Sequence, residues 1–184
     1  MSARVFDPFR LDVQAFVNDA GELAGRWPLR RFERIAETLH AQSPPTEADQ
    51  VEWAAHGEQR AARGAQPQTW LHLKAQTRLR LECQRCLQPV DTALNIDRSF
   101  RFVAGEDAAA QLDADSEDDV LALTRALDLA ELVEDELLLA LPLVPRHEVC
   151  PSPLLAADEP GDSQQEQAHP FAALAALKRG SSLN

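Results

Sequence analysis

The chain has 184 residues, with 18 basic and 30 acidic side chains and a formal net charge of −12. This length favours one domain with appendages over two full domains, and a net negative charge argues against sequence-independent binding of nucleic acid. Three cysteines, an odd number, argue against a secreted disulfide framework. The sequence shows neither a signal-peptide core nor an apolar run long enough to span a bilayer. We therefore expect a cytoplasmic protein with no membrane partner.

The first part of the chain predicts two strands and a helix. Arg10 to Val17 alternates apolar and polar side chains, as a half-buried strand does. Residues 28–40 predict a helix, because a proline suits the first turn and apolar side chains recur at helical spacing. Thr46 to His56 predicts a weaker strand, and Gly57 to Gln68 a polar loop.

Residues 70–103 carry the clearest pattern, that of a long hairpin. From Trp70 to Cys83 apolar side chains alternate with polar ones, and the alternation resumes from Val90 to Phe102 after a short connection. The pattern predicts a strand pair with one buried face and one solvated face.

Residues 105–136 hold most of the negative charge, with twelve acidic side chains and one basic one. Residues 105–119 have almost no large apolar side chains and predict a mobile acidic loop. Residues 129–141 predict a helix, since Asp128 can cap its start, Glu131 stands where a capping box places it, and Pro142 stops it.

The end of the chain predicts two appendages to a single domain of residues 1–150. Residues 151–169 read as a flexible linker, and residues 170–184 as a short C-terminal helical segment and tail, which packs back on the domain or docks into a partner groove. The fold class predicted is α+β: a largely antiparallel sheet with a long central hairpin, two packed helices, an acidic loop and a flexible C-terminal arm.

The most specific chemical signal is the pair Cys83 and Cys86, separated by two residues at the tip of the predicted hairpin. Such a pair can present both sulfurs to one tetrahedral metal, and His147 with Cys150 offers a second half-site. Three thiolates and one imidazole would suit a structural zinc ion. Two alternatives stay open, namely three ordinary reduced thiols and a dithiol–disulfide enzyme. The second is disfavoured because redox pairs usually open a helix.

Basic side chains on the polar face of the hairpin form a second candidate site. His72, Lys74, Arg78 and Arg80 alternate outward, and Arg85 extends the row into the turn. This row predicts contact with RNA phosphates, while a solvated sheet face is the alternative. The acidic residues 105–119 predict a docking surface for a basic partner such as a ribosomal protein, and the alternative is a solvated loop that only aids solubility.

Catalytic patterns are lacking elsewhere in the sequence, which has no glycine-rich phosphate loop, no GxSxG and no HExxH. Glu134, Asp135 and Glu136 could serve as acid–base groups, but a solvated helix face is the simpler interpretation. We therefore expect a protein that is not an enzyme.

Three blocks of the chain resemble the YceD family, known as the large ribosomal RNA subunit accumulation proteins. They are Leu81-Glu82-Cys83-Gln84-Arg85-Cys86-Leu87, the run from Leu132 to Pro145 with His147 and Cys150, and Pro170-Phe171 to Leu177-Lys178-Arg179. The resemblance implies a bacterial cytoplasmic protein needed for synthesis, processing or stability of large-subunit (23S) ribosomal RNA. It implies no catalytic residues, and a metal site in part of the family.

The function expected is that of a non-enzymatic ribosome-biogenesis factor acting on large-subunit ribosomal RNA or a pre-ribosomal particle. Two alternatives remain: a chaperone for one basic ribosomal protein without RNA contact, and a zinc- or thiol-dependent protein. The response to salt distinguishes the factor that contacts RNA from the chaperone, because a phosphate-dominated complex loses affinity steeply as salt rises.

Overall fold

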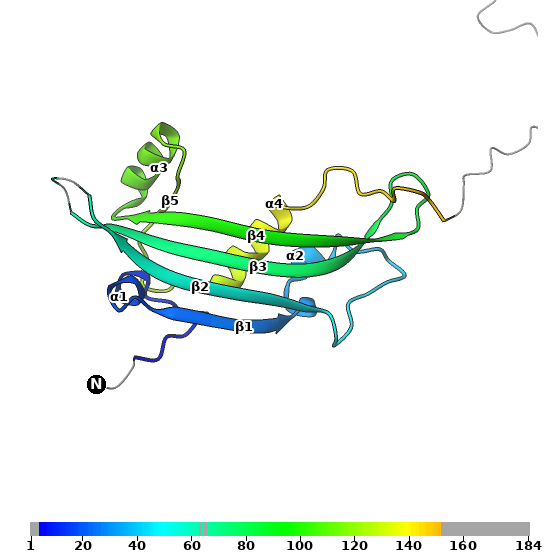
Figure 1. The fold of residues 1–184 in the computed structure, drawn as a ribbon, viewed down its shortest axis with the longest axis horizontal. Coiled ribbons are helices and arrows are strands. Elements are labelled where there is room, and N and C mark those ends of the chain that lie inside the picture. The colour runs from blue at the N-terminus through cyan, green and yellow to red at the C-terminus, as the bar shows by residue number, and fades with distance from the viewer. Residues whose placement is uncertain (1–3, 63, 65, 152–184) are drawn as a thin grey trace, which may run out of the picture. The chain divides into compact units, whose positions relative to one another are not determined.

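A five-stranded sheet is the frame of the structure, a computed structural model that describes residues 4–62, 64 and 66–151 (Figure 1). The strands are β1 (Glu22–Pro28), β2 (Gln50–Arg60), β3 (Gln68–Glu82), β4 (Pro89–Val103) and β5 (Asp119–Ala122). They lie in chain order across the sheet; β1 to β4 are antiparallel, and β5 is parallel to β4. With its helices, this sheet confirms the predicted α+β class.

The predicted hairpin is confirmed as β3 and β4. Leu71 lies opposite Phe100 and Leu81 opposite Val90, so the apolar side chains of both strands share one face. All four of these side chains are buried. The strict alternation of the sequence therefore fixed both the strands and their register, since a slip of one residue would turn every apolar side chain outward.

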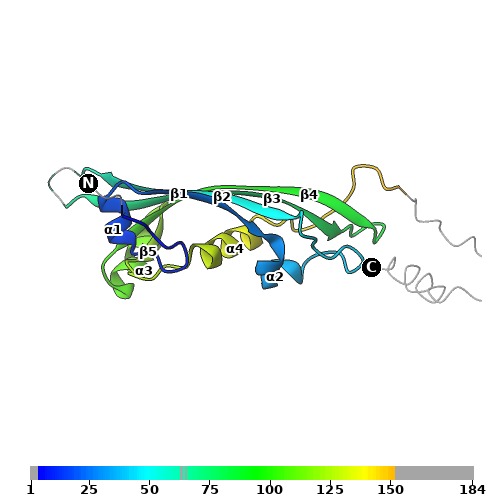
Figure 2. The same ribbon diagram turned by 90° about the horizontal axis from the view of Figure 1, so that it is seen from below.

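The helices cover one side of the sheet (Figure 2). They are α1 (Val13–Asn18), the 3₁₀ turn η1 (Leu29–Arg31), α2 (Glu33–Ala36), α3 (Glu106–Asp115) and α4 (Leu129–Leu139). The opposite side, here called the open face, carries alternate β3 residues from His72 to Arg80, which are exposed or half-buried. The sheet is thus buried on one face and solvated on the other.

Helix α4 confirms the predicted helix at 129–141, ending slightly earlier. The Asp128 carboxylate accepts hydrogen bonds from the N–H groups of Ala130 and Glu131 at 2.8 and 3.2 Å, as an N-cap does. Leu129, Val133 and Leu137 recur at helical spacing and are fully buried against the sheet.

The strand predicted at Arg10 to Val17 is wrong, because these residues lead into α1. The Asp12 side chain accepts a hydrogen bond from Ala15 N at 3.0 Å and starts the helix there. Val13, Phe16 and Val17 then fall on one buried helical face. Alternation over so few residues fits either period, and the side-chain cap decides between them.

The helix predicted at 28–40 is broken into η1 and α2. Pro28 ends β1, a strand the sequence analysis did not predict, and only residues 29–31 and 33–36 are helical. The chain then leaves the helix to run beside β3, where His40 N donates to Arg80 O at 2.8 Å. Among the apolar side chains at helical spacing, Leu29, Phe32 and Ile35 are nevertheless buried, and Ala36 and Leu39 are half-buried.

The polar loop predicted at Gly57 to Gln68 is partly wrong, because β2 continues to Arg60. A Cβ at Gly57 would lie 2.8 Å from Val17 Cα, so a glycine is needed where α1 packs on β2. Glycine in a strand marks such a close approach.

The segment 105–119, predicted as a loop, contains α3. Ala109 is buried, and Asp113 accepts a hydrogen bond from Val120 N at 2.9 Å, which holds the helix against β5. Acidic side chains and few large apolar ones predict a mobile loop here, but alanines within the segment are good helix formers.

Two further predictions concern the end of the chain and the membrane. The linker predicted at 151–169, apart from Pro151, and the segment 170–184 lie outside the described residues. Within the described part of the chain, no helix is long and apolar enough to cross a membrane.

Candidate metal centre

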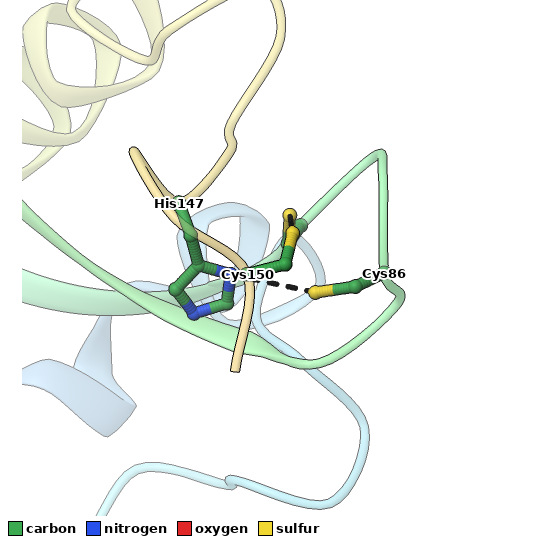
Figure 3. A group of neighbouring side chains, drawn as sticks. Cys86, His147 and Cys150 are labelled. Atoms are coloured by element: carbon green, nitrogen blue, oxygen red, sulfur yellow. Dashed lines mark hydrogen bonds between the residues drawn. The ribbon is translucent and has the colours of Figure 1, made fainter. Parts of the chain in front are cut away.

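Four side chains converge where the β3–β4 turn meets the chain after α4 (Figure 3). The ligand atoms of Cys83, Cys86, His147 and Cys150 all lie within 4.8 Å of one another. Cys83 Sγ is 4.0 Å from Cys150 Sγ, and Cys86 Sγ is 3.4 Å from His147 Nδ1. A tetrahedral zinc ion with Zn–S bonds of about 2.3 Å places its ligand atoms about 3.8 Å apart. The cluster therefore has the size of such a site.

The β3–β4 turn shapes the first half of the cluster. Cys83 N donates to Gln88 O at 3.0 Å, and Leu87 N donates to Cys83 O at 2.8 Å. Leu87 has a φ of 57°, in the left-handed region that few non-glycine residues adopt. The buried His40 ring lies 3.1 Å from the Leu87 carbonyl and can donate to it through Nε2. Cys83 and Cys86 are thereby brought to one side of the turn, and both are buried.

The segment after α4 supplies the second half. Gln84 N donates to Pro145 O at 2.9 Å, which joins this segment to the turn. His147 Nε2 lies 3.1 Å from Pro89 O, a carbonyl that can only accept, so Nε2 carries the proton. The lone pair of Nδ1 then faces Cys86. A ligand histidine held by a backbone carbonyl through its other nitrogen is the usual arrangement around zinc.

The backbone also favours a thiolate at Cys83. Burial raises the pKa of the Cys83 thiol, but hydrogen bonds from the backbone N–H groups of Arg85, His147 and Cys86 lower that pKa to about 5. Burial raises the pKa of the Cys86 thiol. A metal ion binds thiolates, so the cluster holds one ready ligand and others that a metal would deprotonate.

Arg85 points into this centre instead of extending the row of basic residues on β3. Its Nε donates to Cys150 Sγ at 2.9 Å, and its Nη2 donates to the carbonyls of His147 and Glu148 at 3.1 and 3.3 Å. The hydrogen bond to Cys150 raises the pKa of Arg85. No local sequence pattern indicates this contact, because the two residues lie more than sixty positions apart.

The other basic residues of the predicted row lie on the open face. Lys74 pairs with Asp97 at 3.1 Å and Arg80 with Asp49 at 3.3 Å. Arg78 is exposed and has no ion-pair partner among the residues that the structure describes. The face thus carries charges of both signs.

The open face also places Ser99, His72 and Glu58 in one hydrogen-bonded chain. His72 Nδ1 is 2.8 Å from Ser99 Oγ, and Nε2 is 2.7 Å from Glu58 Oε2. This order resembles a nucleophile, base and acid. However, the neighbouring hollow of about 400 Å³ is lined by His56 and His72 and not by Ser99. The three side chains hold the strands together without presenting a nucleophile to that hollow.

The acidic residues of α4 have structural partners. Glu134 accepts hydrogen bonds from the N–H groups of Arg34 and Ile35 at 2.8 and 3.3 Å, and Arg34 also pairs with Asp135 at 2.7 Å. Helix α4 therefore caps α2. The interpretation of a solvated helix face is wrong for Glu134, whose side chain is 13% exposed, whereas that of Asp135 is 48% exposed.

Glu136 forms a second link, from α4 to the sheet. It is buried and pairs with Arg98 of β4 at 3.3 Å, and Arg98 also pairs with Asp119 at 2.8 Å. Burial raises the pKa of Glu136, and attraction to Arg98 opposes that rise. The two ion pairs of Arg98 link α4, β4 and β5, and they give the buried Glu136 carboxylate a structural role.

The sequence is similar to one family model and to a protein of known name. The family model described as "Large ribosomal RNA subunit accumulation protein YceD" matches residues 71–178, which include the whole cluster. A protein of that name from Haemophilus influenzae is 38% identical over 110 residues, covering 58% of this chain and 63% of its own length. The match thus spans less than two thirds of that relative. No solved structure matches the chain.

Proposed function

The chain belongs to the YceD family of large ribosomal RNA subunit accumulation proteins, and from this we propose that it is a cytoplasmic, non-enzymatic ribosome-biogenesis factor. In this role it supports synthesis, processing or stability of 23S ribosomal RNA. The family match carries the proposal, since it covers the hairpin, α4 and the metal centre together. The non-enzymatic role is supported by the closed donor cluster and by a Ser99 that does not line the neighbouring hollow.

The open face is the surface we propose for RNA, with Lys74, Arg78 and Arg80 as contacts. Arg78 is the leading candidate, because it is exposed and free of an ion pair in the described part of the chain. To bind phosphate, Lys74 would have to leave its ion pair with Asp97, and Arg80 would have to leave its ion pair with Asp49. Because the face carries both signs of charge, we expect few phosphate contacts, and we expect the RNA bound through them to be lost at high salt.

The second proposed partner is a basic ribosomal protein, which would meet the acidic surface around α3. This helix begins with Glu106 and Asp107 and ends at Asp115, and Glu117 and Asp118 follow it. Complementary charge there would raise the rate and specificity of association more than the affinity.

Recovery of the tagged protein from its own cells, at low and at high salt, tests the RNA contact. We expect large-subunit RNA to co-purify at low salt and to be reduced in a double variant, Arg78→Glu with Arg80→Glu. Arg125→Glu is the control for the reversal of one charge, because Arg125 is exposed and lies outside the strands. A single basic ribosomal protein recovered at both salts, with no RNA, would replace the RNA proposal by the chaperone.

We further propose that the cluster is a structural zinc site. Its four donors, Cys83, Cys86, His147 and Cys150, fill every position of a tetrahedron, whereas a catalytic zinc keeps one position open for water. Soft thiolates favour zinc over magnesium or calcium, which prefer oxygen ligands. The hairpin setting of the cysteine pair supports zinc over a dithiol–disulfide enzyme. Bound zinc would join the hairpin tip to the chain after α4.

A further inference from the structure

We propose that Arg85 is a functional part of the metal centre, where it compensates the charge of the thiolates and holds Cys150 in position to ligate. This inference rests on the proposed zinc site. It assigns a charge-neutralising and positioning role to a residue that the sequence analysis placed on an RNA-binding face.

The guanidinium joins the two halves of the cluster. Arg85 stands between Cys83 and Cys86 in the turn, yet its three hydrogen bonds all go to the segment 147–150. Two of them hold the carbonyls of His147 and Glu148, and the third reaches Cys150 Sγ at 2.9 Å. One planar side chain therefore fixes the backbone next to one ligand and the sulfur of another. A fork of fixed N–H donors suits this task, and a lysine ammonium does not offer it.

Charge gives Arg85 a second role. Three thiolates and a neutral imidazole around Zn²⁺ leave a net charge of about −1, which is costly to keep partly buried. Cys83 and Cys86 are buried and Cys150 is half-buried. Within residues 4–62, 64 and 66–151, no carboxylate forms an ion pair with Arg85, and its Nε lies 2.9 Å from Cys150 Sγ, so the thiolates of a zinc-bound cluster would be its anionic partners. With Arg85 included, the centre is neutral.

This arrangement separates Arg85 from the open face. Its Nε and Nη2 atoms hydrogen-bond to the segment 147–150, so the side chain is directed to the metal centre and does not continue the row of basic residues on β3. Loss of Arg85 is therefore expected to weaken metal binding, whereas loss of Arg78 is expected to leave metal binding unchanged.

Zinc affinity of the full chain, measured by competition with a chromophoric chelator, tests the inference. We expect Arg85→Gln to weaken zinc binding about 10- to 100-fold, the range seen when a group that supports a metal ligand is lost. Arg85→Lys keeps the charge but lacks the fork of N–H donors, so its zinc affinity should fall between those of Arg85→Gln and the wild type. Arg146→Gln is the matched control, because Arg146 is exposed beside His147 and its substitution removes the same charge. It should bind zinc as the wild type does.

Cobalt(II) substitution gives a readout that fold stability alone would not change. Removing the N–H donor from Cys150 should shift the thiolate-to-cobalt charge-transfer band in Arg85→Gln, while the bands that report tetrahedral coordination persist. If Arg85→Gln does not fold, the same comparison is made with Arg85→Lys, which also lacks the N–H from Nε. The inference is wrong if these variants bind zinc as tightly as wild type and leave the band unchanged. A wild-type chain that binds no zinc would instead refute the metal site itself.

Discussion

Removal of zinc from the purified protein is expected to release the tip of the β3–β4 hairpin and the chain around His147 while the sheet stays folded. The cluster binds two segments to each other, but the core is built from Leu71, Leu79, Leu129 and other buried side chains that do not depend on it. At zinc concentrations about 1,000 times the dissociation constant, bound metal stabilises the folded state by about 4 kcal/mol. For a domain of this size, we expect chelation to lower the melting temperature by roughly 8–16 °C.

Metal analysis followed by hydrogen exchange checks this expectation. The purified protein should contain about one zinc ion per chain, as a closed four-ligand site requires. On chelation, the amides of Gln84 and Leu87, which bond to Pro145 and Cys83, should lose protection. Amides in the middle of β3 should keep theirs. Cys86→Ser should behave as the chelated wild type does. A protein that contains no zinc and does not respond to chelator would show that the four side chains are ordinary thiols and a histidine.

Replacement of Phe16 by alanine is expected to lower the free energy of unfolding by about 3–5 kcal/mol, the cost of a large cavity in a core. Phe16 is fully buried between α1 and the sheet, and Phe6 packs edge-on against it with ring centroids 5.1 Å apart. Gly21 and Gly57 lie against its ring and have no side chains that could fill the space.

Urea unfolding of Phe16→Ala beside wild type measures this loss. The control is Val5→Ala, because Val5 is 94% exposed and its truncation should change stability by less than about 0.5 kcal/mol. A loss below about 1 kcal/mol for Phe16→Ala would mean that α1 contributes little to the core.

Some parts of this fold could be predicted from sequence because the local pattern and the tertiary contacts agree. In β3 and β4 every second residue is apolar over many positions, and only a strand pair buries them together. In α4 the cap at Asp128 and the helical spacing of its leucines indicate the same element. The cysteine pair was recognisable for a related reason, since its spacing is set by local turn geometry.

Other parts depend on contacts that no local pattern records. Helix α1 has six residues, too few to separate helical from strand spacing, and its cap settled the outcome. Helix α2 is capped by Glu134, which lies 100 positions away. Arg85 stands in a turn, where alternation no longer indicates the direction of a side chain. Its partners lie in the segment that follows α4 and could be found only from the fold.

The two proposed sites can be disabled separately. Cys86 lies in the metal centre, whereas Arg78 is an exposed residue of the open face. If a variant loses zinc but RNA still co-purifies with it, the metal centre stabilises the fold and is not needed for RNA binding. Loss of both in Cys86→Ser, with the sheet intact, would mean that the hairpin tip takes part in binding.

The ratio of large-subunit to small-subunit ribosomal RNA, measured in cells that lack this chain, reports on the proposed role in ribosomal RNA accumulation. We expect the ratio to fall when the chain is absent and to return when the wild-type chain is supplied. We expect incomplete recovery with Cys86→Ser, because the hairpin tip is then no longer held. An unchanged ratio in cells without the chain would contradict a role in large-subunit RNA accumulation.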